Sequence, residues 1–260
     1  MAWVAQRPDG SIASVGFDKA QASTDSDLTI IDIADELVIS VMEGKLNLQH
    51  ALSGPPPAAT RAHVEISCTL GNSTYPTMMR QSDIDALSAL CKLIPVDAIA
   101  VEIGSRLGGG AKIMLDNAPR IRRLYCIDVD WAHGSTCASD KHLAGIIEAQ
   151  AIDPNMTIYD FAKSLLSGYP AARLLPMSSP DGLGWWSETV DFIFEDSSHT
   201  NPQLRDSLEF WVPLVKSGGI IAGHDYVRTW PDVIQEVDAL AARLGATLQV
   251  QGSVWWMIKT

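Results

Sequence analysis

The side chains best suited to acid–base chemistry in this sequence stand directly after two apolar segments. Asp196 and His199 follow the segment 190–195, and His224 follows the segment 218–223. An unperturbed imidazole titrates at about pH 6.5, so either histidine could serve as a general base. We expect His199 to be the base and His224 to contact substrate or to stand beside a metal ion. A purely structural role is the alternative for each histidine.

Asp196 and Asp225 also offer the ligand type of a hard divalent cation. Mg²⁺ and Ca²⁺ prefer carboxylate oxygens, keep water ligands and seldom need a complete protein cage. An ion held by both acids would lower the pKa of a substrate hydroxyl and so favour a nucleophilic alkoxide. The competing interpretation is that Asp196 accepts hydrogen bonds from a cofactor or substrate and that Asp225 caps the following turn.

A glycine-rich loop follows another apolar segment, 98–103. Its sequence reads E-x-G-x-x-x-G-G and begins at Glu102. A dinucleotide site needs G-x-G-x-x-G, but Arg106 stands at the second glycine position. A phosphate-binding P-loop needs a lysine where Ala111 stands. The loop therefore suits neither ligand.

Alternating strands and helices must position these residues. Strands are predicted at 98–103, 123–128, 172–176, 190–195 and 218–223, and helices at 109–118, 141–150, 158–167, 202–215 and 231–244. Continuous apolar strands separated by helices predict an α/β fold with a doubly wound, mostly parallel sheet. Only Gly252 and its neighbours separate the last two strands, so these must form an antiparallel hairpin. Ligands of such sheets bind outside the carboxyl ends of the strands.

The N-terminal part has a different character. A short hairpin is expected around residues 8–10, and apolar residues at helical spacing predict a helix from Asp27 to Gly44. A stiff linker is predicted at 54–57, where Gly-Pro-Pro-Pro stands. We therefore divide the chain into an N-terminal extension, 1–57, and a main domain, 58–260. The extension is expected to serve as a lid or as a contact in a homo-oligomer.

A further helix is expected to open at Ser82, with Asp85 as the acid of a capping box, and to close at Pro95. It precedes the first strand of the main domain.

The loop at Glu102 and the terminal hairpin together resemble the class I S-adenosylmethionine (SAM) dependent methyltransferases. The resemblance implies a Rossmann-like domain with SAM as cofactor. It implies that Glu102 binds near the ammonium group and that Gly104 and Gly108 allow close backbone approach, with Ser105 and Gly109 in the same loop. SAM is cationic at sulfur and nitrogen, so an acid in this loop is electrostatically sensible.

The same resemblance asks for an acid at the end of the next strand, to bind both ribose hydroxyls. Asp128 stands there, followed by Val129, and lies 24 residues beyond the first glycine of the loop. The typical spacing is roughly 20. Asp130 is a nearby alternative, and the alternative role of Asp128 is a helix or turn cap. Trp131 would lie against the adenine or pack in the core. Ser178 stands where the family has a polar residue at the adenine.

The stretches D-F-x-x-x-D-x-x-H, ending at His199, and G-H-D-Y, at 223–226, resemble a branch of bacterial O-methyltransferases. That branch implies methylation of a hydroxylated small molecule, such as a sugar or a glycosylated natural product. The resemblance covers about residues 82–260. A cephalosporin hydroxylase-like relative with the same fold, and a non-catalytic SAM-binding module, are the alternatives.

Composition narrows the choice of partners. The chain of 260 residues carries a formal net charge of −12, which disfavours nucleic acid. No stretch of 18 apolar residues exists, so no membrane partner is expected. The sequence shows neither a secretory start nor a C-x-x-C pair, and a cytoplasmic protein with reduced cysteines is expected.

Overall fold

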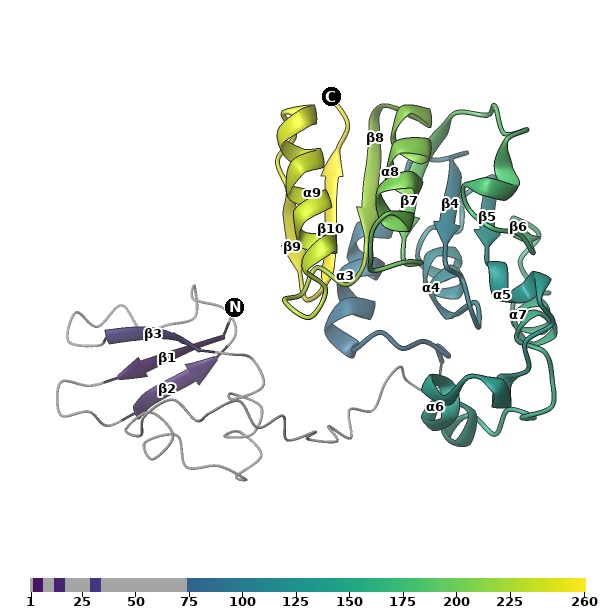
Figure 1. Cartoon of the computed structure of the whole chain (residues 1–260), viewed down its shortest axis with the longest axis horizontal. Coiled ribbons are helices and arrows are strands. Elements are labelled where there is room, and N and C mark those ends of the chain that lie inside the picture. Colours follow the sequence, from purple (N-terminus) through teal and green to yellow (C-terminus); the bar gives the residue numbers. More distant parts are fainter. Residues whose placement is uncertain (1, 7–11, 17–28, 34–73) are drawn as a thin grey trace. The chain divides into compact units, whose positions relative to one another are not determined.

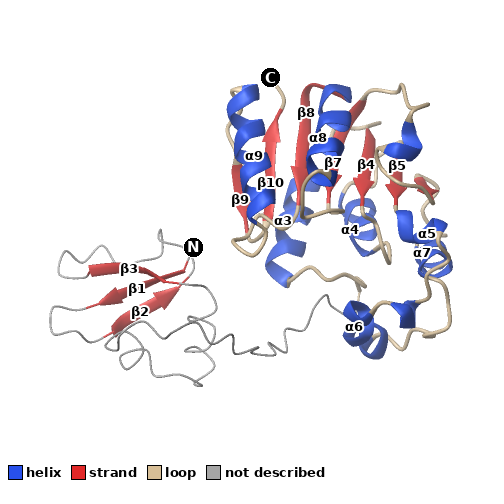
Figure 2. Cartoon of the chain, viewed as in Figure 1, coloured by secondary structure: helices blue, strands red, loops and turns tan. Residues whose placement is uncertain are grey.

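A computed structural model describes residues 2–6, 12–16, 29–33 and 74–260 (Figures 1 and 2). The chain divides into two compact units, residues 1–66 and 67–260. In the first unit, β1 (Ala2–Gln6) pairs antiparallel with both β2 (Ile12–Gly16) and β3 (Thr29–Ile33). The β1–β2 pair confirms the expected hairpin, whose loop residues 8–10 lie outside the described residues.

The prediction of a helix starting at Asp27 is wrong over Thr29–Ile33. These residues form β3 and pair with β1 in unbroken register, from Ala2 opposite Ile33 to Gln6 opposite Thr29. Four of the five residues of β3 are β-branched, and such side chains favour strands over helices. The remainder of the expected helix, 34–44, and the linker at 54–57 lie outside the described residues.

The main domain is built on a seven-stranded sheet in the order β6-β5-β4-β7-β8-β10-β9 (Figure 2). Neighbouring strands are parallel from β6 to β8, while β10 is antiparallel to both β8 and β9. This confirms the predicted mostly parallel sheet with an antiparallel terminal hairpin. The strands are β4 (Ile99–Ile103), β5 (Arg123–Ile127), β6 (Ala172–Leu175), β7 (Val190–Glu195), β8 (Val215–Gly223), β9 (Gln249–Gln251) and β10 (Val254–Ile258).

Two helical layers cover the sheet. Strand residues alternate between the two faces, so Ala100 and Phe192 pack in one core cluster while Val101 and Ile193 pack in the other. The main helices are α3 (Gln81–Cys91), α4 (Gly109–Asn117), α5 (Val129–Ala132), α6 (Ala144–Ala149), α7 (Ile158–Leu165), α8 (Gln203–Leu214) and α9 (Pro231–Leu244). No helix in the described parts of the chain is long and apolar enough to cross a bilayer.

Two local predictions need correction. The helix expected at 141–150 is divided into a 3₁₀ turn, η3 (Lys141–Leu143), and α6, because the Asp140 carboxylate caps η3 by accepting the His142 N–H at 2.9 Å. The start of α3 is stabilised by Asp83, which accepts the Arg80 N–H at 3.1 Å, and not by a box between Ser82 and Asp85.

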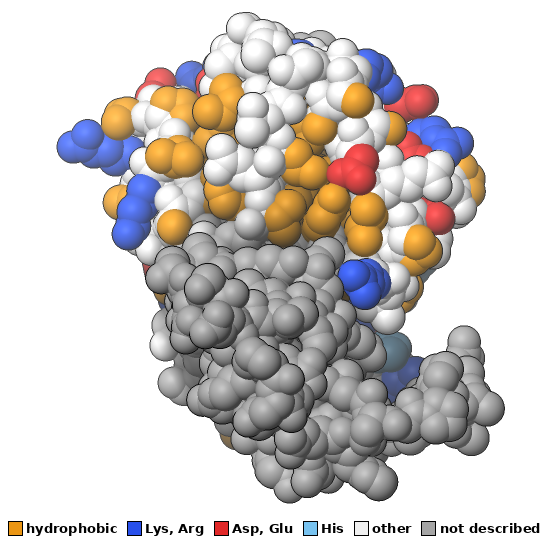
Figure 3. Space-filling model, turned by 90° about the vertical axis from the view of Figure 1, so that its left-hand side faces the viewer, with side chains coloured by type: hydrophobic (Ala, Val, Ile, Leu, Met, Phe, Trp, Pro, Cys, Tyr) orange, Lys and Arg blue, Asp and Glu red, His pale blue; other side chains and the backbone are white. Residues whose placement is uncertain are grey.

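The sheet ends at the short strand β9, where Gln249, Val250 and Gln251 are all exposed. Figure 3 shows this side of the main domain, with hydrophobic and uncharged side chains at its centre and charged ones mainly toward its rim. Short edge strands limit unwanted pairing between sheets.

Candidate functional site

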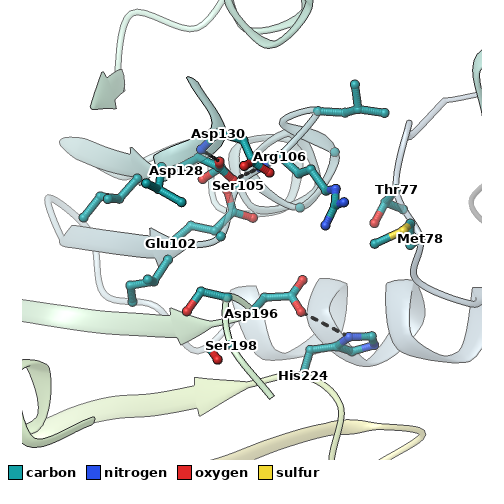
Figure 4. A pocket seen from close by; sticks show the side chains of 18 of the residues that line it. Thr77, Met78, Glu102, Ser105, Arg106, Asp128, Asp130, Asp196, Ser198 and His224 are labelled. Atoms are coloured by element: carbon teal, nitrogen blue, oxygen red, sulfur yellow. Dashed lines mark hydrogen bonds and ion pairs between the residues drawn. The ribbon is translucent and has the colours of Figure 1, made fainter. Parts of the chain in front are cut away.

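A cavity of about 460 Å³ opens at the carboxyl ends of the parallel strands, where the strand order reverses between β4 and β7 (Figure 4). Nearly all of the site residues predicted from the sequence line it. They are Glu102, Gly104, Ser105, Gly109, Asp128, Val129, Ser178, Asp196, His199, His224 and Asp225. Gly108 is the exception, because it stands behind the wall as the N-cap of α4, in the left-handed conformation with φ 81°.

Gly104 lies where the loop after β4 meets the loop after β7. Its φ is 89°, and a Cβ at this position would overlap the backbone carbonyl of Asp196. Next to this close approach, the Asp196 N–H donates a hydrogen bond to the Ile103 carbonyl at 2.8 Å. The loop after β4 and the loop after β7 are therefore in backbone contact, and this contact requires a glycine at position 104.

Glu102 is a buried acid whose carboxylate faces Gly110. A Cβ at position 110 would overlap Glu102 Oε1, and Oε2 is buried without a hydrogen-bond partner among the described residues. Burial, with a smaller contribution from the charges of Asp196 and Asp128, raises the pKa of Glu102 to about 8, against the lowering effect of the nearby Ser105 hydroxyl. A buried acid with an unused oxygen in a cavity is suited to a cationic ligand. The sequence prediction missed Gly110, although the triple glycine marks it.

Asp128 both caps a helix and lines the cavity. Its Oδ1 accepts the Asp130 N–H at 2.8 Å at the start of α5, and its Oδ2 accepts the Arg106 N–H at 2.7 Å. Burial raises the pKa of Asp128, while these two hydrogen bonds lower it. Trp131 is buried and donates its Nε1–H to the Arg106 carbonyl at 2.8 Å, so it packs in the core as its alternative role predicted.

His199 and Asp225 form a close pair on the other side of the cavity. Their Nε2 and Oδ2 atoms lie 2.6 Å apart. This hydrogen bond is the main cause that raises the pKa of His199, against the effect of burial. The His199 ring stacks on Trp230, with centroids 4.4 Å apart and planes at 19°. Asp225 itself has φ 60°, a left-handed conformation that few non-glycine residues adopt and that aspartate tolerates better than most.

His224 lies among three carboxylates. Its Nδ1 is 3.3 Å from both Asp196 Oδ1 and Asp225 Oδ2, and its Nε2 is 3.4 Å from Asp83 Oδ2 (Figure 4 shows the contact with Asp196). Nε2 also lies 2.9 Å from the hydroxyl of Ser253. Burial alone would lower the pKa of His224, but the acids raise it well above its usual range. The side chain is therefore a fixed imidazolium with both nitrogens engaged.

The pKa of Asp225 responds to the same network. Burial alone would raise it, but hydrogen bonds from His199 and His224 hold it well below its usual range. Asp225 is thus an anion across the pH range in which proteins work.

Asp196, His199 and Asp225 also form a set of ligand atoms that could hold a metal ion. One ligand atom from each lies within 4.8 Å of the others. Two carboxylates with one imidazole, open to a cavity, are a donor set that suits several divalent ions. The acids come from the tips of β7 and β8, which are neighbours in the sheet.

Several lining residues could not be found from the sequence. The segment 76–79 packs on the start of α4, where a Cβ at Gly109 would overlap the Pro76 carbonyl. Leu143 and Ile146 add apolar surface, and Trp230 adds the face behind His199. Arg106, noted only as a break in the dinucleotide motif, also lines the cavity.

Comparisons with known proteins bear on the fold that carries this cavity. Residues 101–226 match the family model described as "Methyltransferase domain". The solved structure of the O-methyltransferase NovP has the same fold, with a TM-score of 0.53 and 17% identity, over 71% of this chain and 82% of NovP. A Staphylococcus aureus protein provisionally named a caffeoyl-CoA O-methyltransferase gives a TM-score of 0.49 and 15% identity, over 70% and 85% of the two chains. No curated protein sequence matches significantly.

Proposed function

We propose that this chain, a class I SAM-dependent methyltransferase, transfers the methyl group of SAM to a hydroxyl oxygen of a small molecule. The observation that carries the proposal is the composition of the cavity. Buried acids suited to a cationic nucleoside, Glu102 and Asp128, line it together with a His199–Asp225 pair that is suited to taking a proton.

The cofactor half suits SAM group by group. Glu102 Oε2, which lacks a partner among the described residues, would accept a hydrogen bond from the ammonium group. Each oxygen of Asp128 accepts one backbone N–H and keeps a further lone pair for a ribose hydroxyl. Val129 and Ser178 line the part of the cavity assigned to the adenine.

The acceptor half would deprotonate the attacking hydroxyl. Asp225 binds Nε2 of His199, which leaves Nδ1 to take the proton. The acceptor oxygen bonds to the methyl carbon as the carbon–sulfur bond breaks, and S-adenosylhomocysteine (SAH) departs. The protein mainly aligns oxygen, carbon and sulfur and excludes water. Asp196 and the imidazolium of His224, which line the same part of the cavity, would stand beside the reacting groups.

A divalent cation such as Mg²⁺ fits the same half of the cavity. Asp196 and Asp225 would hold it as carboxylate ligands, and His199 would either complete the ligand set or remain the base. A bound ion supplies Lewis acidity that lowers the pKa of the acceptor hydroxyl.

We assign the acceptor to hydroxylated small molecules, such as a sugar or a glycosylated natural product. The two motifs after β7 and β8 support this class. The acids that line the cavity and the net charge of −12 disfavour a nucleic acid as substrate.

Calorimetry with SAM and SAH tests the cofactor, and mass spectrometry of a screen of hydroxylated acceptors tests the reaction. We expect both ligands to bind the parent protein, Asp128→Ala to weaken both, and His199→Ala to bind SAH while losing turnover. Products that gain a methyl group support the proposal, whereas products that gain an oxygen would indicate the hydroxylase-like alternative. Failure of the parent protein to bind either ligand would overturn the proposal.

A further inference from the structure

Arg106 adopts a backbone conformation that its side chain makes costly. Its φ is 46°, in the left-handed region that favours glycine. Two contacts hold the residue there, since its N–H donates to Asp128 and its carbonyl accepts from Trp131. A glycine would adopt this conformation at lower cost, which indicates that the arginine side chain has a function at this position.

The guanidinium group is held in place by one ion pair but still has unused hydrogen-bond donors. Its Nη2 forms a close ion pair with Asp140 Oδ2, and Asp140 is itself fixed by the His142 N–H at the start of η3. Nε is buried and has no hydrogen-bond partner among the described residues. A guanidinium has five N–H donors, so one ion pair leaves capacity for a planar anion. Figure 4 shows the group projecting toward the side of the cavity lined by Thr77 and Met78.

The charges around the cavity indicate which anion. Of the described residues that line it, Arg106 is the one arginine or lysine, whereas acids are numerous. SAM carries positive charge on sulfur and nitrogen and negative charge only on its α-carboxylate. The acids therefore suit every polar part of the cofactor except the carboxylate, which needs a cation.

The positions of the acid and the arginine favour the cofactor over an anionic acceptor. Glu102 stands near the end of β4, Arg106 stands four residues later in the loop that follows, and both line the same cavity. The ammonium and carboxylate groups of an α-amino acid are attached to one carbon, so a neighbouring acid and base can bind both at once. We infer that Arg106 binds the α-carboxylate of the SAM methionine, as the cationic counterpart of Glu102. This inference rests on the proposed function.

Two ligands and two variants test it by calorimetry. SAH carries the carboxylate, and S-adenosyl-3-thiopropylamine is the same molecule without it. For Arg106→Gln we expect the affinity for SAH to fall about tenfold or more, the range for a hydrogen bond to a charged group. We expect the affinity for the decarboxylated analogue to stay within about twofold. Arg123→Gln, which removes another arginine–carboxylate pair outside the cavity, is the matched control and should change neither affinity.

Arg106→Gly separates binding from folding. It relieves the left-handed conformation but also removes the ion pair with Asp140, so the melting temperatures of both variants are measured to show that each is folded at the assay temperature, while its affinity for SAH should fall as in Arg106→Gln. Equal losses for both ligands, or unchanged SAH affinity in both variants, would overturn the inference while leaving the methyltransferase intact. Absence of SAH binding by the parent protein would instead overturn the proposed function.

Discussion

Asp83 places a carboxylate oxygen 3.4 Å from Nε2 of His224 and so joins the start of α3 to the tip of β8. The same carboxylate accepts the Ser253 N–H at 2.8 Å, between β9 and β10, and a Cβ at Gly252 would overlap it. Asp83 is almost fully buried. Three elements that are distant in sequence are thus held to one imidazolium at the edge of the cavity.

Removal of this contact should destabilise the domain. Asp83→Ala leaves the backbone N–H groups of Arg80 and Ser253 without an acceptor and removes one of the three carboxylates around His224. We expect a loss of about 3 kcal/mol in the free energy of unfolding, the lower end for a broken buried ion pair, because Asp196 and Asp225 still face His224. Urea unfolding measures the loss. Asp85→Ala, an exposed acid on the same helix, is the control and should change stability by less than about 0.5 kcal/mol.

Glu102 should make SAM binding depend on pH. Its pKa of about 8 means that the free protein holds a proton there at pH 7. Binding of the ammonium group favours the carboxylate, so binding releases that proton and affinity rises as pH increases toward 8. Above this, affinity should fall as the ligand's own amino group, with a pKa of about 7.7–8.0, loses its proton.

Calorimetry at pH 7 in buffers of different ionisation enthalpy measures the proton release. Glu102→Gln should remove the dependence on buffer and weaken binding. An unchanged dependence on buffer in this variant would show that another group releases the proton.

Gly110 should be intolerant of even one methyl group. Gly110→Ala forces Glu102 Oε1 to move, and we expect SAH affinity to fall about tenfold or more, because a charge-assisted contact is displaced. Gly145→Ala on α6 is the control, since a Cβ there meets no other atom within 4 Å. That control should bind SAH normally and gain about 0.5–1 kcal/mol of stability from helix propensity.

Divalent ions should increase turnover if Asp196 and Asp225 hold one. We expect EDTA to lower methyl transfer and added Mg²⁺ to restore it, with Asp225→Asn weakening the response to Mg²⁺. His199→Ala distinguishes the two roles of the imidazole. If His199 is the base, the variant loses turnover but keeps its affinity for Mg²⁺. If His199 is a metal ligand, the variant loses both turnover and affinity for Mg²⁺. Turnover that survives EDTA unchanged would contradict metal assistance.

The strands and the residues at their tips could be predicted because their signals are local. Each strand is a continuous apolar run, and the residue after it must lie at the carboxyl edge of a parallel sheet. For the same reason the acids and histidines after β7 and β8 could be placed from the order of the residues alone.

What could not be predicted depends on contacts between distant segments. Asp83 reads as one acid of a helix start, and nothing local links it to His224. The helix predicted from Asp27 is wrong because the helical spacing of apolar residues is only a local signal. Pairing of 29–33 with β1, which the local sequence does not reveal, makes this segment a strand. Arg106 is informative in the sequence only as a mismatch, because its ion-pair partner Asp140 lies far along the chain.

The close backbone approach between Gly104 and Asp196 limits which changes to the cavity the fold can accept. A change of length or path in the 196–199 loop would move the backbone that touches the loop after β4, and with it one wall of the cavity. Redesign of the pocket should therefore start from Trp230, which borders the cavity from the start of α9, and not from the segment 76–79, whose Pro76 carbonyl packs against Gly109.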